Sequence, residues 1–143
     1  MRNLTATLCL TIALLFGCTG VCKSADFQKG LTAYKSGDYA TALREWTPLT
    51  KQGDAGIQSL VGAMYNEGKG VPQDYKTAVK WYKLAAEQGN AHAQSNLGFM
   101  YDQGKGVLKD YVYAHMWYNI AASSGDKVAS KNRDLIAKEM TPS

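Results

Sequence analysis

Side chains suited to metal or thiol chemistry are few in this chain of 143 residues. It has two histidines, His92 and His115, and its three cysteines are Cys9, Cys18 and Cys22. A zinc site needs about four converging ligands, or three with a water molecule. Two histidines without downstream thiols therefore predict no metal site and no cofactor. The sequence after Lys23 can form neither a disulfide framework nor a thiol nucleophile.

One short pattern is compatible with nucleophilic catalysis. Ser124-Gly125-Asp126-Lys127 matches S-x-x-K, the nucleophile pattern of β-lactamases and penicillin-binding proteins. Neither S-D-N nor K-T-G, the companion patterns, occurs in the chain. We expect Ser124 and Lys127 to lie on either side of a turn between helices. A penicillin-interacting or β-lactamase-like hydrolase is therefore the alternative, and a non-enzymatic function is the main expectation.

Two glycine-lysine loops, 68–70 and 104–106, suggest phosphate binding at first sight. They lack the G-x-x-x-x-G-K-[ST] spacing and follow predicted helices, whereas a P-loop follows a strand. We interpret them as structural turns. The net charge is +4, and no run of five like charges occurs, so the sequence gives no support for nucleic-acid binding.

An internal repeat dominates the sequence. Residues 55–90 and 91–126 align without a gap, and 18 of the 36 aligned positions are identical. A fixed period of this length is typical of stacked helical arrays. Residues 25–53 form a shortened copy, in which the loop between the helices has lost four residues.

Two series of capping residues, each with a period of 36, divide every unit into two helices. Asp or Asn follows a glycine at the start of each first helix, and Asp precedes a tyrosine at the start of each second helix. The first series is Asp54, Asn90 and Asp126; the second is Asp38, Asp74 and Asp110. The sequence thus predicts helices at 26–35, 39–51, 55–67, 74–88, 91–103, 110–124 and 127–140.

Small and large residues at matching positions predict how these helices pack. Gly62 and Gly98 on the first helices, with Ala78 and Ala114 on the second, permit close approach. Large residues are expected to fill the core around them: Val61, Tyr65, Trp81 and Tyr82 in one repeat, and Leu97, Tyr101, Trp117 and Tyr118 in the next.

The string L/V-G-x-M-Y-x-x-G-K-G-V-x-x-D-Y-x-x-A-x-x-W-Y-x-x-A-A-x-x-G resembles the Sel-1-like repeat, a relative of the tetratricopeptide repeat. The resemblance implies an all-α fold: a right-handed α-solenoid of helix-turn-helix repeats, with about three units and a capping helix at 127–140. It also implies a module that binds a protein or peptide on its concave side. The chain departs from some secreted members, which carry a cysteine pair in each repeat, and its end at Thr141-Pro142-Ser143 leaves open a truncated member.

We expect the concave groove to be lined by one stripe of the first helices, which varies between units while the packing positions agree. The alternative is that Phe27 and Phe99 pack against neighbouring helices. We expect the partner to be a protein or peptide of unknown identity, and self-association through the open ends of the solenoid is a further expectation. The groove residues predicted from the sequence are Phe27, Tyr34, Lys35, Ser59, Asn66, Glu67, His92, Ser95, Phe99 and Asp102.

The first 24 residues resemble a secretory signal. Arg2 precedes the apolar stretch 8–16 (LCLTIALLF), which is too short to span a bilayer. Cleavage after Ser24 would place Cys22 and Ser24 at the two small-residue positions. The sequence thus predicts a periplasmic or secreted domain at 25–143. Lipid anchoring through Cys18 is the alternative, although Phe16 is bulky for that pattern.

Overall fold

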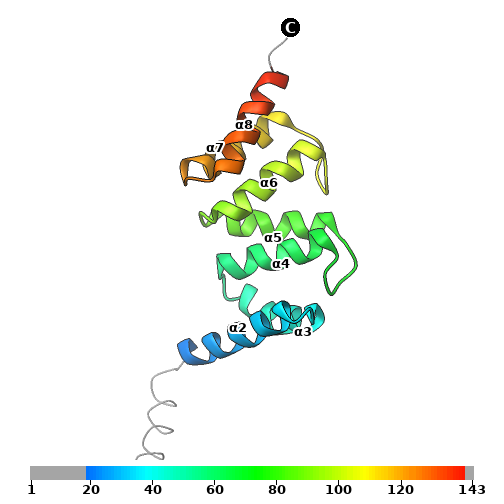
Figure 1. The fold of residues 1–143 in the computed structure, drawn as a ribbon, viewed down its shortest axis with the longest axis vertical. Coiled ribbons are helices and arrows are strands. Elements are labelled where there is room, and N and C mark those ends of the chain that lie inside the picture. Colours follow the sequence, from blue (N-terminus) through cyan, green and yellow to red (C-terminus); the bar gives the residue numbers. More distant parts are fainter. Residues whose placement is uncertain (1–18, 141–143) are drawn as a thin grey trace, which may run out of the picture.

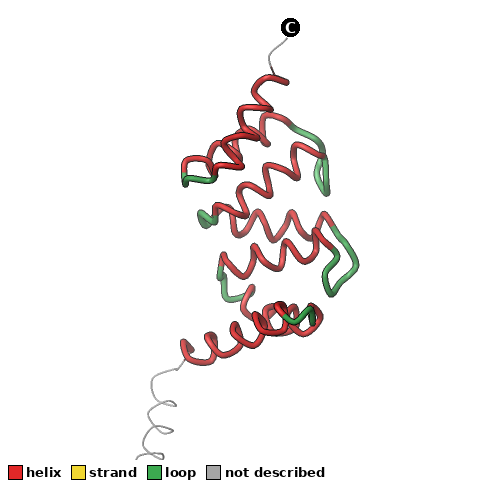
Figure 2. Tube along the Cα trace, in the orientation of Figure 1, coloured by secondary structure: helices red, strands yellow, loops and turns green. Residues whose placement is uncertain are grey.

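The protein is a stack of α-helices. The computed structural model describes residues 19–140, with side chains from Asp26 onward. These residues form seven helices and no strand, which confirms the predicted all-α class (Figures 1 and 2). The helices are α2 (Thr19–Lys35), α3 (Tyr39–Thr50), α4 (Ala55–Glu67), α5 (Tyr75–Glu87), α6 (Ala91–Gln103), α7 (Tyr111–Ser123) and α8 (Lys127–Met140).

The helices pack in pairs, and the pairs stack into a solenoid. Helix α2 packs against α3, α4 against α5, and α6 against α7, while α8 packs on α7 and α6. Contacts of α3 with α4 and of α5 with α6 join the pairs, so the stack runs along the long axis of the molecule (Figure 1). No helix in the described part of the chain has the length and apolar character of a membrane span.

Helix α2 is longer than the sequence predicts. It begins at Thr19, whereas residue 26 was the expected start. No proline lies between Thr19 and Asp26 to stop the helix earlier. The predicted leader, residues 1–24, lies mostly outside the described residues.

The predicted caps set the helix boundaries. In the first series, the Asp54 carboxylate accepts a hydrogen bond from the Ile57 amide at 3.0 Å, and the Asn90 side chain accepts one from the Ala93 amide at 2.9 Å. In the second series, Asp74 accepts from the amides of two residues in the next turn. The glycines that precede the first series, Gly53, Gly89 and Gly125, all have φ near +90°, where other residues are strained.

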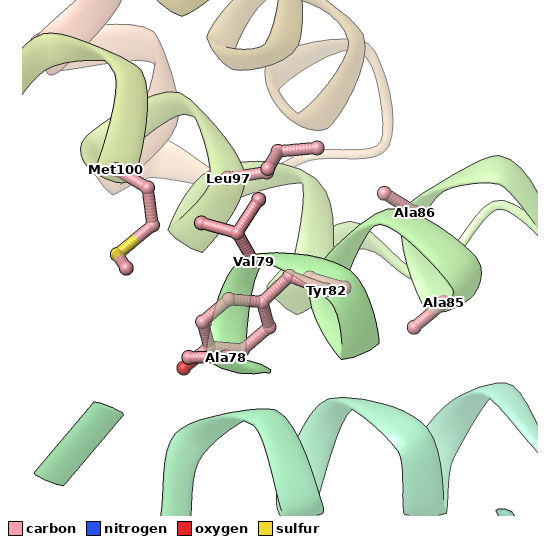
Figure 3. Close-up of a cluster of buried hydrophobic side chains, with 8 residues drawn as sticks. Ala78, Val79, Tyr82, Ala85, Ala86, Leu97 and Met100 are labelled. Atoms are coloured by element: carbon pink, nitrogen blue, oxygen red, sulfur yellow. The ribbon is translucent and has the colours of Figure 1, made fainter. Parts of the chain in front are cut away.

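Within each pair, a glycine lies against a large aromatic residue. A Cβ on Gly62 would lie 2.9 Å from the Tyr82 ring, and one on Gly98 would lie 2.8 Å from the Tyr118 ring. Both tyrosines are only 1% exposed. The close approach lets each tyrosine fill the core, as Figure 3 shows for Tyr82 beside Ala78 and Val79.

A buried glutamine links each full repeat to the unit before it. The Gln58 side-chain amide donates to the carbonyl of Thr50 at 3.1 Å, and that of Gln94 donates to the carbonyl of Ala86 at 3.1 Å. Both glutamines are 4% exposed. Each therefore adds a side-chain hydrogen bond to a carbonyl at the end of the preceding helix, which also accepts the backbone amide of Gly53 or Gly89, and ties the two units together.

The glycine-lysine loops also join neighbouring units. The Lys69 ammonium lies 5.5 Å from the centre of the Tyr34 ring and 5.3 Å from that of Tyr39. In the next loop, Lys105 lies in the same way over Tyr75, at 5.3 Å, and over Phe99, at 4.9 Å. Each lysine thus packs on at least one aromatic ring of the preceding helix hairpin, and Lys105 also packs on Phe99 of its own hairpin, in keeping with the structural interpretation of the loops.

Candidate binding groove

The first helices of the units form an open hollow on one side of the stack. Its volume is about 660 Å³, within the range of ligand pockets. Helices α2, α4 and α6 and the end of α3 contribute to it. Its lining consists of Phe27, Leu49, Gln52, Asp54, Gly56, Ile57, Ser59, Leu60, Ala63, Asn90, His92 and Asn96.

Small residues on α4 create this space. Gly56, Ser59 and Ala63 follow one another at helical spacing and face the hollow. At the positions that match Ser59 and Gly56, helix α2 carries Phe27 and helix α6 carries His92. The hollow thus lies where the small side chains of α4 are flanked by larger side chains of α2 and α6.

The floor of the hollow is apolar. Leu49 is 3% exposed and Ile57 is 5% exposed, and both belong to the hydrophobic cluster that fills the first part of the stack. Leu60 and Phe27 are half-buried beside them. An apolar side chain placed here would leave water for a surface that already packs like a protein core.

Polar groups surround this floor. One oxygen each of Asp54 and Asn90 is engaged in capping α4 or α6. The side chains of Gln52, His92 and Asn96 make no hydrogen bond within the described part of the chain, so they are free to bond to a bound molecule. The hollow therefore combines an apolar floor with a rim of donors and acceptors.

Three of the residues predicted from the sequence lie together in this hollow: Phe27, Ser59 and His92. Phe27 also stacks on Trp46, with ring centres 6.2 Å apart, and its carbonyl accepts a hydrogen bond from the Trp46 indole. The packing that the sequence analysis kept as an alternative is thus present, although Phe27 still lines the hollow.

A second, shallower hollow of about 510 Å³ follows toward α8. It shares His92 and Asn96 with the first and brings in Ser95, another predicted groove residue. Ser124 and Val128 close its far side. The two hollows are therefore consecutive along the stack and meet at α6.

The other six predicted residues lie outside both hollows. Tyr34 is half-buried in an aromatic cluster, 5.1 Å from the Tyr39 ring and 5.7 Å from the Trp46 ring. Phe99 is 36% exposed and carries Lys105 over its ring. Lys35 is exposed in the last turn of α2.

The remaining three make local contacts. Glu67 forms an ion pair with Lys69 at 2.6 Å, and the pKa of Lys69 is raised, first by this hydrogen bond and then by the Tyr34 hydroxyl. Asp102 accepts a hydrogen bond from the Gln103 side chain at 2.9 Å. The Asn66 side-chain oxygen is buried without a hydrogen-bond partner in the described structure.

Several lining residues were not predicted from the sequence. Leu49 and Ile57 were missed because a core residue and a pocket floor have the same apolar signature. Asp54 and Asn90 were explained as caps, which they are, but caps also sit at the mouth of the hollow. The available signal was the contrast of Gly56 and Ser59 with the larger residues at matching positions of neighbouring units.

The S-x-x-K pattern does not form a catalytic arrangement here. Ser124 ends α7 and is exposed, and Asp126 caps α8 through the amides of Val128 and Ala129. No hydrogen bond joins Ser124 to Lys127 among the described residues. Within residues 19–140, no group of three histidine, cysteine, aspartate or glutamate side chains could hold a metal ion.

Comparison with known proteins gives the same repeat. The model of the Sel1 repeat matches residues 58–90 and 91–126. No curated protein matches the chain significantly in sequence. Repeats of this family generally serve as protein–protein interaction modules, and its members are generally non-enzymatic scaffolds.

Two solved bacterial structures are similar to the chain. A Sel1 repeat protein from Oxalobacter formigenes is 34% identical, with a TM-score of 0.74 over 79% of this chain and 46% of its own. The protein c5321, a protective antigen present in uropathogenic Escherichia coli strains that displays an SLR fold, is 29% identical. Its TM-score is 0.77 over 83% of this chain and 26% of its own. The chain thus spans less than half of either protein; by its repeats and its helical stack, it is a Sel1-repeat protein.

Proposed function

We propose that the protein is a non-enzymatic interaction module that binds a peptide segment of a partner protein across the two hollows. The observation that carries this proposal is the first hollow, with its apolar floor of Leu49, Ile57 and Leu60 and its free polar groups at the rim. The general role of the family supports a protein partner.

The energetics favour a segment that spans both hollows. Burial of one aliphatic or aromatic side chain contributes roughly 1.5–3 kcal/mol. Micromolar affinity requires about 8 kcal/mol, before the cost of ordering the peptide. One anchor in the first hollow is therefore insufficient, and a segment that continues past His92 and Asn96 into the second hollow gains further contacts.

The polar rim would set the register of this segment. An extended peptide exposes backbone N–H and C=O groups, which must find partners when they leave water. Side-chain amides both donate and accept, so Gln52 and Asn96 suit this task. The apolar floor would then select the anchor residue, and the amides would fix the path of the backbone.

The test is a peptide-library selection followed by one reciprocal substitution. Peptides selected from a random library on the wild-type protein are expected to share an apolar anchor. Ala63→Phe places on α4 the residue that α6 carries at the same position, and because Ala63 lines the first hollow, we expect the added ring to take up part of its volume. We expect selected peptides to bind this variant at least about tenfold more weakly.

The matched control adds the same ring elsewhere on the same repeat. Lys80 is exposed on α5 and lines neither hollow, so Lys80→Phe should leave peptide affinity unchanged. Equal loss of affinity in both variants, or unchanged affinity in Ala63→Phe, would remove the groove assignment. Thermal melts of each variant show whether the fold is intact.

The non-enzymatic part of the proposal has a separate test. The protein should neither hydrolyse a chromogenic β-lactam nor be labelled covalently by a fluorescent penicillin. Labelling that Ser124→Ala removes would establish the alternative, a penicillin-interacting hydrolase.

We also propose that the protein acts outside the cytoplasm, after cleavage following Ser24. The leader composition supports this, and the bacterial source of the similar solved structures is compatible with it. Cleavage there would shorten α2 by six residues and keep Phe27, the first residue that lines the hollow. N-terminal mass analysis of protein from cell fractions should find Ala25 first; an uncleaved chain in the cytoplasm would contradict the proposal.

A further inference from the structure

The outer face of α7 carries an apolar ridge that no other part of the described chain covers. Val112 is 65% exposed, Met116 is 39% exposed and Ile120 is 37% exposed. These residues are four apart, so they lie in one row along the helix. Tyr113, 50% exposed, widens the ridge on one side.

The matching helix of the other full repeat shows that this ridge is unusual. Helix α5 carries Lys76 and Lys80 at the positions of Val112 and Met116, and both lysines are exposed. Helix α5 lies inside the stack, with a packed unit on either side. Its exposed lysines therefore lie on an outer face of the solenoid. The ridge occupies the matching face of α7, so it is not the surface on which a further repeat would stack.

Charge indicates what kind of surface covers this ridge. Helix α7 contains no Lys, Arg, Asp or Glu, whereas α5 contains Lys76, Lys80, Lys83 and Glu87. A partner recognised by its charge, whether an acidic segment or an anionic lipid surface, would find its counter-charges on α5 and not on α7. The surface that fits α7 is itself apolar and neutral.

We propose that the ridge of α7 pairs with the same ridge of a second copy of this chain. A two-fold symmetric contact is self-complementary by construction, and a neutral apolar ridge meets its copy without charge repulsion. Rows of residues at i+4 spacing interdigitate when two helices cross at about 50°. In this arrangement Met116 lies next to the axis and faces its own copy, while Val112 faces Ile120 of the second copy.

The size of the patch sets the expected strength. A stable interface buries roughly 800 Å² on each partner. Four partly exposed side chains on one helix supply only part of this area, so the dimer is expected to be weak and to dissociate on dilution. The contact uses none of the residues that line the groove, so the dimer and the proposed peptide binding stand or fall separately.

Sedimentation of the full chain over a wide concentration range, from about 1 μM to about 1 mM, tests the proposal. The wild-type protein should pass from monomer to dimer. Met116→Lys reproduces the residue that α5 carries at the same position, so the fold tolerates it, and it should weaken the dimer at least about tenfold, because two ammonium groups then meet at the axis. Met116→Glu should do the same.

A mixture of the two variants gives the sharpest result. If Met116 faces its own copy, an equimolar mixture of the Lys and Glu variants should dimerise although neither does alone. Lys80→Glu on α5 is the matched control and should leave the wild-type dimer unchanged. A monomer at every concentration, a mixture that stays monomeric, or equal loss in Lys80→Glu would each overturn the proposal.

Discussion

Helix pairs α4–α5 and α6–α7 share one backbone plan and differ in the surfaces that they expose. Gly62 faces Tyr82 in the first pair as Gly98 faces Tyr118 in the second, with nearly the same clearance. The positions that the two pairs share are those of the helix caps, of the glycines in the turns, and of the glycines that make room for an aromatic ring.

On the exposed faces the two pairs diverge. Toward the groove, Ala63 in the first pair is replaced by Phe99 in the second; on the outer face, Lys80 is replaced by Met116. The contrast teaches that the constant positions specify how the helices stack. The variable positions give each repeat an exposed surface that differs from that of its neighbour. Substitutions at constant positions should therefore act on stability, and substitutions at variable positions on binding.

The largest expected effect concerns the inter-helix loop. Gly106 has φ +71°, and a Cβ there would lie 2.8 Å from the Lys76 backbone nitrogen and closer still to Tyr75. Gly106→Ala thus combines an unfavourable backbone conformation with a backbone clash, and should cost about 3 kcal/mol. Chemical denaturation measures this loss.

Its control lies two residues earlier in the same loop. Gly104 also has positive φ, +65°, but a Cβ there meets only Lys109 of the same loop, with the Lys109 Cβ at 3.2 Å and its backbone nitrogen at 3.4 Å. Gly104→Ala should therefore cost about 1 kcal/mol, the backbone penalty alone. Equal losses of unfolding free energy in the two variants would show that the contact of Gly106 with the preceding unit does not explain the requirement for glycine at this position.

A smaller effect tests a partly buried hydrogen bond that the first pair makes and the second lacks. The Gln58 side-chain oxygen accepts a hydrogen bond from Gln88 at 2.8 Å, whereas the Gln94 oxygen has no partner in the described structure. Ser124 stands where Gln88 stands, with the same backbone conformation but too short a side chain. Ser124→Gln should therefore raise the free energy of unfolding by about 1 kcal/mol.

The reverse exchange sharpens this prediction. Gln88→Ser removes the donor of Gln58 and should lower stability by about 1 kcal/mol. Thermal and denaturant unfolding of both variants measure these changes in the free energy of unfolding. If Ser124→Gln fails to stabilise the protein, the orphan oxygen of Gln94 is satisfied in another way.

The smallest effect appears in acid. The pKa of Asp74 lies below its ordinary value, because its carboxylate accepts hydrogen bonds from the Thr77 hydroxyl and amide. A depressed carboxyl pKa contributes stability above the unfolded value, near 3.8, and this contribution is lost as pH falls through the lower folded value.

Thr77→Val removes the hydroxyl donor and should raise the folded-state pKa of Asp74 toward its ordinary value, so that the contribution becomes smaller and its loss is complete at higher pH. NMR titration of the Asp74 carboxyl measures the change. An unchanged pKa in Thr77→Val would show that the amide contacts alone hold the carboxylate in its charged form.

Much of the stack could be predicted from the sequence, because its determinants are local. A cap such as Asp54 acts on the next turn of its own helix, and a glycine such as Gly89 acts on its own φ angle. Each of these local effects requires a particular residue type at a fixed position of the 36-residue period, which can be seen in the sequence. The helix starts at residues 39, 55, 91 and 127 were predicted for this reason.

The groove was harder to predict because it depends on distances between units. Tyr34 lies on the predicted stripe, yet the shortened first unit brings it against Tyr39 and Trp46. Leu49 at the end of α3 and Asn96 in the middle of α6 reach the hollow only through the stacking of three units. The period of the sequence predicts which face of a helix a residue occupies. Whether the surface at that face is hollow depends on the side chains of the neighbouring helices.

The most direct test of the groove is an amide NMR titration with a peptide selected from the library. If the peptide binds across the two hollows, the shifts should concentrate at Gly56, Ala63 and His92 and continue to Ser95, while Lys80 and Met116 on the outer face stay unchanged. Shifts confined to the outer helices, or spread evenly over the chain, would contradict the account.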